Sequence, residues 1–238
     1  MSALYLIRHG QAGPRNDYDR LSDLGARQAE LLGVKLAAQG MEFDAVYSGA
    51  LARQKATARL VGERYEAAGV PFPQPCEDPL WNEFDLGDVY AQIAGPLARD
   101  NPRFARAFAA LEAAMEDPEH DVHRSHSICD IEVVRAWVAG KYPYEGESWA
   151  AFQARILTPL KRLAESDNGG KVAVFTSATP IGICVAHALG ADETHSWKLA
   201  GVAYNSGVST LRVARAELRL FSFNSVGHLE DPNHWSFK

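Results

Sequence analysis

Residues 3–10 read Ala-Leu-Tyr-Leu-Ile-Arg-His-Gly, and this stretch says most about the fold. It opens with an apolar run that stops abruptly at Arg8 and His9. A short apolar run of this kind is typical of a buried strand in a parallel sheet. Because ligands bind outside the carboxyl ends of such strands, Arg8 and His9 stand where a binding site is expected.

The segments that follow alternate between helical and strand-like patterns. A polar loop over about residues 10–20 leads to Ser22, a suitable N-cap for a helix that ends near Gly40. A second strand is expected at 43–47, and a second helix at about 51–65. This order predicts a βαβ unit and a mostly parallel sheet.

The middle of the chain breaks this rhythm. It lacks a strong strand signal and contains helical pieces such as 103–116, so we expect a helical cap inserted at about 84–147. The core pattern then resumes with a helix capped by Ser148 and with strands at 171–176, 206–213 and 217–223. The sequence therefore predicts one α/β domain over 1–238, a three-layer α/β/α sandwich with a mostly parallel sheet and a cap insertion.

Composition narrows the partners and the compartment. The formal net charge of the 238 residues is −6, without a basic cluster, so we expect no nucleic-acid partner. No apolar run approaches the length of a membrane span, and the start does not resemble a signal peptide, so we expect a cytoplasmic protein without a membrane partner. The odd number and wide spacing of the cysteines favour reduced structural thiols at Cys76, Cys129 and Cys184.

Arg8, His9 and Gly10 form the first candidate site. A neutral imidazole can attack phosphorus, and the resulting phosphoramidate hydrolyses readily, which divides one hard displacement into two easier ones. Arg8 offers a planar set of donors to phosphate oxygens, and Gly10 lets the backbone pass close to the phosphate. The triplet alone is a weak signal, and its position at the end of a strand gives it weight.

Two further segments carry candidate residues. Arg53 lies in the first turns of a helix, where free amides and the helix dipole favour anions, although a solvated helix face is the alternative. Glu83 lies among large apolar side chains, which can keep a carboxylic acid protonated until it donates to a leaving oxygen. Asp85 and Asp88 are the alternatives for that role.

Together these segments resemble the histidine phosphatase superfamily, which is also called the phosphoglycerate mutase-like superfamily. The matching motifs are Arg8-His9-Gly10, Ser-x-x-x-Ala-Arg53-x-x-x-Thr-Ala and Leu-x-x-Glu83-x-x-x-Gly. The stretches Tyr18–Gly25 and Asn224–Leu229 also resemble family elements, so the resemblance covers nearly all of the chain except the cap.

The resemblance implies a phosphatase that hydrolyses small phosphomonoesters through a phosphohistidine on His9. It implies that Glu83 protonates the leaving group and that no metal or other cofactor is needed. The phosphate-binding residues are then expected to be Arg8, Arg53, Gln11 and Ser177. The expected partner is a small phosphorylated substrate, and a homodimer remains open.

One position departs from the family pattern. The family normally carries a second histidine after the late core strand, and Ala178 stands there, as in a bacterial subgroup that lacks it; an engineered change is the other option. A missing donor of this kind typically costs about a hundred- to a thousand-fold in rate. Ser177, backbone amides near Thr179 and His228 are the candidates to compensate, with packing as the alternative for His228.

Two other functions stay open. A cofactor-dependent phosphoglycerate mutase shares the fold and the nucleophile, but the stretches that mutases usually carry after the nucleophile and at the acid are missing here. A phospho-ligand-binding pseudo-enzyme is the third option, because Ala178 replaces the second histidine. The spacing of His120, His123 and His126 suggests a metal site, but their polar segment favours a solvated loop.

Overall fold

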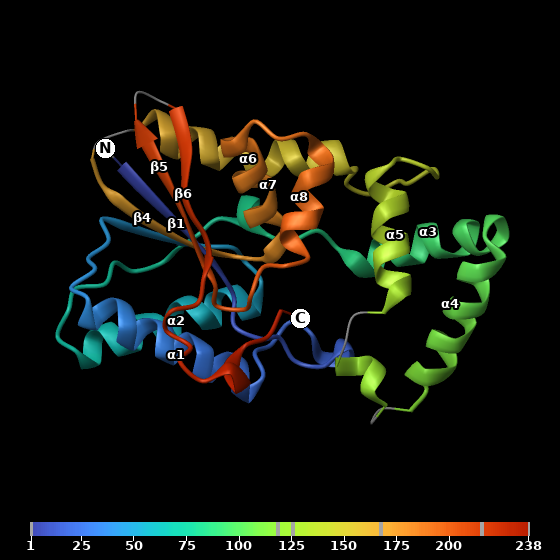
Figure 1. Cartoon of the computed structure of the whole chain (residues 1–238), viewed down its shortest axis with the longest axis horizontal. Coiled ribbons are helices and arrows are strands. Elements are labelled where there is room, and N and C mark those ends of the chain that lie inside the picture. Colours follow the sequence, from blue (N-terminus) through green and yellow to red (C-terminus); the bar gives the residue numbers. More distant parts are fainter. Residues whose placement is uncertain (1, 118–119, 125–126, 167–168, 215–216, 238) are drawn as a thin grey trace. The chain divides into compact units, whose positions relative to one another are not determined.

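The computed structural model describes residues 2–117, 120–124, 127–166, 169–214 and 217–237, and these residues form one six-stranded sheet together with helices. The strand order is β3-β2-β4-β1-β5-β6 (Figure 1). The strands are β1 (Ser2–Arg8), β2 (Ala45–Ser48), β3 (Cys76–Glu77), β4 (Lys171–Thr176), β5 (Val208–Ala214) and β6 (Glu217–Ser225). Strands β1 to β4 are parallel to one another, whereas β5 is antiparallel to both of its neighbours, β1 and β6. The predicted α/β fold with a mostly parallel sheet is confirmed.

Strand β1 lies between β4 and β5 because both of its faces are apolar. Leu4, Leu6 and Ile7 are at most 3% exposed. In the parallel ladder with β4, Ala3 lies opposite Lys171 and Arg8 opposite Thr176. This register brings the ends of the two strands, and the residues that follow them, to the same edge of the sheet.

The chain divides into two compact units. The first consists of residues 1–13, 17–83 and 155–238, and the second of residues 14–16 and 84–154. Within the first unit, α1 (Asp23–Ala38) and α2 (Ala52–Ala67) cover one face of the sheet. Helices α7 (Ala178–Leu189) and α8 (Glu193–Ala200) lie on the other side, with the later part of α6 (Trp149–Glu165) (Figure 1).

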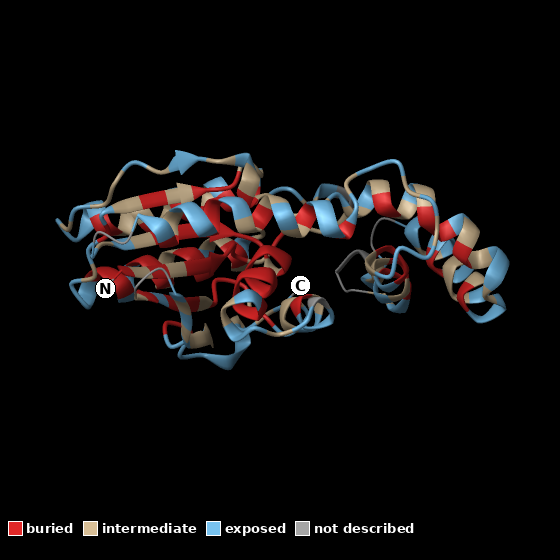
Figure 2. Cartoon of the chain, turned by 90° about the horizontal axis from the view of Figure 1, so that it is seen from above, coloured by how far each residue is buried: buried red, intermediate tan, exposed pale blue. Residues whose placement is uncertain are grey.

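The core of the first unit follows from the sequence patterns. On the α1 and α2 side it is built mainly from Ile7, Leu32, Phe43, Val46, Val61, Tyr65 and Phe175. The predicted N-cap is confirmed, because the Ser22 side chain accepts a hydrogen bond from the Gly25 amide at 3.0 Å. Figure 2 shows buried residues gathered along the strands and exposed residues on the outer sides of the helices.

The second unit is helical in the residues that the structure describes. It contains α3 (Leu86–Asp100), α4 (Pro102–Met115), α5 (Ile128–Val138) and the start of α6. Asn101 ends α3 and caps α4, accepting from the amides of Arg103 and Phe104. The aromatic core of this second unit consists of Phe84, Trp137, Trp149 and Phe152.

Three residues of the loop after β1 belong to this second unit. Arg15 donates two hydrogen bonds to the buried carboxylate of Asp130, at 3.0 and 2.7 Å. Asp130 also accepts from the Tyr90 hydroxyl at 2.6 Å. These bonds fix the middle of the loop, because a buried carboxylate is stable only when its oxygens are well paired.

Some elements differ from the prediction. The second strand begins at Ala45, since the Asp44 side chain accepts from the Lys171 amide at 2.7 Å just before it. Strand β3 has only two residues, both exposed, so it has no apolar pattern. Within the described residues, no helix has both the length and the apolar character that crossing a bilayer requires.

Candidate active site

The candidate residues of the first unit meet at the carboxyl ends of β1 and β4. Arg8 is the last residue of β1, and the amide of His9 donates to the carbonyl of Thr176 at 2.9 Å. Arg53 is the second residue of α2. The side chains of Arg8, His9 and Arg53 come from residues that are 3%, 2% and 6% exposed, so three polar groups share a site largely closed to water.

Hydrogen bonds fix the tautomer of His9. Its Nδ1 lies 2.7 Å from the carbonyl oxygen of Gly10, which can only accept, so Nδ1 carries the proton. Its Nε2 accepts from Nε of Arg53 at 3.2 Å and therefore carries the lone pair. Burial, and then the charges of Arg53 and Arg8, hold the pKa of His9 well below its usual value. The imidazole is neutral, with Nε2 as its nucleophilic atom.

Arg8 is only partly hydrogen-bonded within the described part of the chain. Its Nη1 donates to the carbonyl of Ala203, whereas its buried Nε has no hydrogen-bond partner in the described part of the chain. Burial lowers the pKa of Arg8, and the nearby Tyr18 and Glu83 oppose that shift. A buried unsatisfied donor in a native protein asks for an explanation, and an anionic ligand provides one here.

Arg53 is held on three sides. Its Nε faces His9, its Nη1 donates to Oδ1 of Asp19 at 2.8 Å, and its guanidinium carbon lies 4.9 Å from the centre of the Tyr18 ring. Arg53 also contributes to lowering the pKa of Arg8, so the two guanidinium groups are close enough to interact. Arg8 and Arg53 therefore both lie near His9, and their predicted binding of one phosphate stays a prediction.

Glu83 reaches the start of α7. Its Oε2 accepts from the Thr179 amide at 3.1 Å. The loop before Glu83 is fixed by the Arg155 guanidinium, which donates to the carbonyls of Leu80 and Asn82 at 2.9 and 3.0 Å. Thr176 donates to the carbonyl of Trp81 at 2.6 Å. Glu83 is therefore placed beside Ala178 by contacts that are distant in sequence.

The two other carboxylates proposed for the role of Glu83 belong to α3. Asp85 is the N-cap of that helix and accepts from the Asp88 amide at 3.0 Å. Asp88 accepts from the Tyr144 hydroxyl at 2.6 Å and from Gln92 at 3.0 Å. Hydrogen bonds from Tyr144 and Gln92 lower the pKa of Asp88, so it is a poor proton donor. Both carboxylates stabilise the second unit.

Ala178 is the first residue of α7, and Ser177 is its N-cap. The Ser177 hydroxyl accepts from Nε2 of Gln54 at 2.9 Å. Of the groups expected to compensate for the missing histidine, the Thr179 amide already donates to Glu83, and Pro180 has no amide hydrogen. The start of this helix therefore offers few donors to an anion.

Gln11 and His228 are not brought to Arg8 and Arg53 by the hydrogen bonds that the structure describes. Oε1 of Gln11 accepts from the Ser22 hydroxyl at 2.8 Å. Nε2 of His228 lies 2.7 Å from the hydroxyl of Ser206, whose amide donates to the carbonyl of His9 at 3.2 Å. Burial, and then the charge of Lys35, lower the pKa of His228 to about 4. Through Ser206, His228 therefore stabilises the backbone at His9.

Several residues of the site had no role in the sequence-based hypothesis. Asp19 and Tyr18 contact Arg53, and Thr57 accepts from the Gly10 amide at 3.1 Å. Gly10 has a second reason to be glycine, besides the expected close approach of the backbone to the phosphate, which stays a prediction. A Cβ on Gly10 would lie 2.2 Å from the carbonyl oxygen of Gly25, so close packing on the start of α1 requires glycine. The sequence signal for Thr57 was its position four residues after Arg53, which places both side chains on the same face of the helix.

A metal ion in a protein needs a set of several ligand side chains gathered around it. Among the described residues, no three histidine, cysteine, aspartate or glutamate side chains gather closely enough to hold a metal ion. His126, one of the three histidines weighed for such a site, lies outside the described residues.

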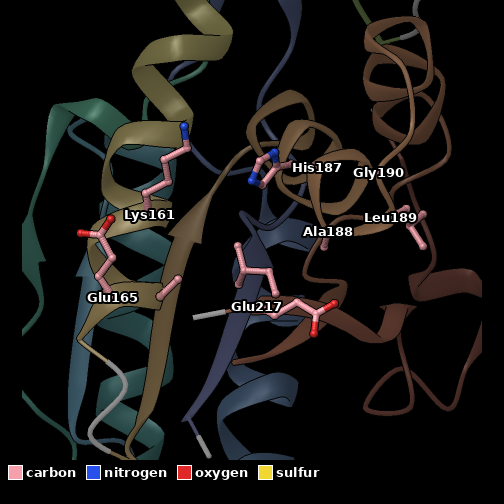
Figure 3. Close-up of a pocket in the computed structure, with 9 residues that line it drawn as sticks. Lys161, Glu165, His187, Ala188, Leu189, Gly190 and Glu217 are labelled. Carbon is pink, nitrogen blue, oxygen red and sulfur yellow. The ribbon is translucent and has the colours of Figure 1, made fainter. Parts of the chain in front are cut away.

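A separate hollow of about 570 Å³ lies at the other end of α7, lined in part by Lys161, Glu165, His187 and Glu217 (Figure 3). Because α7 has 12 residues, this end is about 18 Å from Ala178. Burial, and then the charge of Lys161, lower the pKa of His187. With two carboxylates and one lysine, the hollow does not gather the positive charge that a phosphate needs.

Comparisons with known proteins bear on this site. The sequence profile of the histidine phosphatase superfamily (branch 1) matches residues 4–130 and 127–226. The chain is 24% identical over 157 residues to the mitochondrial serine/threonine-protein phosphatase Pgam5 of Caenorhabditis briggsae, covering 61% of this chain and 52% of that protein. It is 36% identical over 95 residues to the 2,3-bisphosphoglycerate-dependent phosphoglycerate mutase of Azorhizobium caulinodans, covering 36% and 44%. The aligned part spans about half the length of these curated relatives.

The fold is also similar to that of solved structures. The phosphoserine phosphatase of Entamoeba histolytica, solved with 3-phosphoglyceric acid, superposes with a TM-score of 0.62 at 20% identity. The superposition covers 96% of this chain and 100% of that one. At this level of identity the similarity concerns the fold alone.

Proposed function

Because the chain belongs to the histidine phosphatase superfamily, we propose that it hydrolyses small phosphomonoesters through a phosphohistidine formed on His9. The observation that carries this proposal is the neutral His9 ring, whose Nε2 lone pair lies among the guanidinium groups of Arg8 and Arg53. A neutral imidazole is a nucleophile, and flanking guanidinium groups offset the charge that builds up on a transferring phosphoryl group.

In the first step, an oxygen of the substrate phosphate replaces Nε2 of His9 as the acceptor of the hydrogen bond from Nε of Arg53. Nε2 of His9 then attacks phosphorus, and the bond from phosphorus to the ester oxygen breaks. The protonated form of Glu83 gives its proton to that oxygen, so the alcohol leaves neutral and Glu83 becomes a carboxylate. The unpaired Nε of Arg8 and the donors of Arg53 hold the phosphoryl oxygens.

In the second step, water attacks the phosphorus of the phosphohistidine. Glu83 takes a proton from that water, the nitrogen–phosphorus bond breaks, and inorganic phosphate leaves. The cycle returns His9 to its neutral form and Glu83 to its acid form. The reaction needs no group beyond these side chains and water.

The substrate class follows from the family and the site. The three relatives described above differ in their phosphorylated substrates, since they are a protein phosphatase, a phosphoglycerate mutase and a phosphoserine phosphatase. Their common element is a phosphate ester of an alcohol, and we propose that class here. Since Ala178 supplies no donor, turnover is expected to be slow. That Ala178 marks a subgroup without the second histidine stays a prediction.

A phosphate-release screen over small phosphomonoesters tests the proposal. The parent protein is compared with His9→Ala and with His195→Ala, a matched control on an exposed histidine. We expect turnover in the parent and in the control, and none in His9→Ala. Including 3-phosphoglycerate and following 2-phosphoglycerate tests mutase activity, and phosphate binding without turnover by the parent would indicate a pseudo-enzyme.

A further inference from the structure

Asp19 joins two parts of the phosphate site with one carboxylate. Its Oδ1 accepts from Nη1 of Arg53 at 2.8 Å, and its Oδ2 accepts from the Ala52 amide at 3.1 Å. We propose that Asp19 is a positioning residue. It keeps the Arg53 guanidinium oriented while the hydrogen bond from Nε of Arg53 changes its acceptor from Nε2 of His9 to a phosphate oxygen. This inference rests on the proposed function of His9 and Arg53.

The start of α2 needs a cap from elsewhere in the chain. Its N-cap residue is Leu51, which has no side-chain oxygen, although the first amides of a helix lack partners within the helix. Asn82 accepts from the Ala50 amide at 2.7 Å, and Asp19 accepts from the Ala52 amide. Asp19 thus fixes the backbone from which Arg53 projects.

The same carboxylate also fixes the guanidinium group. Arg53 is planar, so holding Nη1 and stacking on Tyr18 set the direction in which its Nε points. In the structure, Nε points at Nε2 of His9. For His9 to attack, Nε must donate to a phosphoryl oxygen instead, and the Asp19 bond lets this exchange occur without loss of the guanidinium orientation.

The negative charge of Asp19 makes it possible to distinguish the positioning of Arg53 from simple electrostatic attraction of the phosphate. Asp19 is anionic and its side chain is 54% exposed, so it weakens the pull of Arg53 on a phosphate dianion. Removing it should therefore leave ground-state phosphate binding intact or slightly stronger. Binding of a transition-state analogue should weaken, because only the transition state requires the full set of oriented donors.

The experiment compares the binding of inorganic phosphate and of vanadate by calorimetry. The variants are Asp19→Ala, which loses both contacts, and Asp19→Asn, which keeps one acceptor oxygen. Glu77→Ala is the matched control, because Glu77 is an exposed carboxylate that pairs with Lys55 of the same helix at 3.2 Å. Each variant is also made in an Arg53→Ala background.

We expect Asp19→Ala to weaken vanadate binding about tenfold, less than the loss from deleting a donor itself. Phosphate binding should change less than about threefold, Asp19→Asn should fall between Ala and the parent, and Glu77→Ala should match the parent. In the Arg53→Ala background, Asp19→Ala should have no further effect on vanadate, although it still lowers the melting temperature through the lost cap.

Two results would overturn the role of Asp19. One is an unchanged ratio of vanadate to phosphate affinity in Asp19→Ala, and the other is the same loss in the Arg53→Ala background. A parent protein that binds neither anion would instead refute the proposed phosphate site, and Asp19 would fall with it. Failure of the inference and failure of the function are therefore distinguishable.

Discussion

Nε of Arg53 lies 3.2 Å from Nε2 of His9, so the guanidinium donates to the lone pair with which the imidazole is to attack. A phosphoryl oxygen has to replace Nε2 as the acceptor before the new bond can form. The contact keeps His9 in one tautomer, and burial, together with the positive charges of Arg53 and Arg8, lowers its pKa and keeps it unprotonated. The predictions below follow from this arrangement and from what surrounds it.

Glu83 should matter most for poor leaving groups. If it protonates the leaving oxygen, Glu83→Gln lowers kcat/KM for an alkyl phosphate by about a hundredfold or more, and much less for an aryl phosphate. Asp85→Asn is the matched control, because Asp85 caps α3. Equal losses on both substrates in Glu83→Gln would leave it a structural role, and a selective loss in Asp85→Asn would move the acid there.

Restoring a histidine at position 178 should increase turnover. Ala178→His adds a donor at the start of α7, and we expect a rise of tens-fold, less than the loss from deleting a well-oriented donor. The measurement is kcat on a simple phosphoester, with the fold checked by circular dichroism. A folded variant with no gain would mean that the reaction does not use a donor at this position.

His228 should make the protein less stable as the pH falls. The pKa of His228 is lowered to about 4 in the folded protein. On acidification, the histidine of the unfolded chain is protonated near pH 6.5, whereas that of the folded protein is protonated only near pH 4. Stability is therefore lost between about pH 6.5 and 4, by at most about 1.4 kcal/mol per pH unit from this group.

Urea unfolding of the parent and of His228→Gln across this range measures the effect. Glutamine keeps an oxygen that can accept from Ser206 but does not titrate, so the variant should lose less stability on acidification. Equal pH dependence of the two proteins would contradict the buried neutral state of His228.

Gly10→Ala should unfold more easily than the parent. The added Cβ would meet the Gly25 carbonyl oxygen at 2.2 Å, so the backbone has to shift, at a cost of about 1–3 kcal/mol. Gly227→Ala is the matched control, because beyond its chain neighbours a Cβ there meets nothing within 4 Å and its φ is not positive, and it should stabilise by at most about 0.4–1 kcal/mol. A Gly10→Ala protein as stable as the parent would show that the close approach is not required.

Local patterns predicted much of the fold. The apolar run of β1 and that of β4, at 171–176, were recognised because buried parallel strands have such runs. The N-cap at Ser22 was recognised because its partner is three residues away. Strand β3 was missed, since two exposed residues carry no periodic signal.

The site was predictable only where a motif carried it. Arg8, His9 and Arg53 were found through the strand ends and the resemblance to the superfamily. The bond between Asp19 and Arg53 spans 34 residues of sequence and the one between Glu83 and Thr179 spans 96, so no local pattern encodes either pair. The contact of His228 with Ser206 likewise depends on tertiary packing.

Detection of a phosphorylated His9 tests the central claim most directly. The protein is mixed with a substrate, denatured within milliseconds at alkaline pH, and its peptides are analysed by mass spectrometry. We predict an acid-labile phosphate on the peptide that contains His9, and none in His9→Ala. A phosphate on Ser177 instead, or undiminished turnover by His9→Ala, would contradict the account.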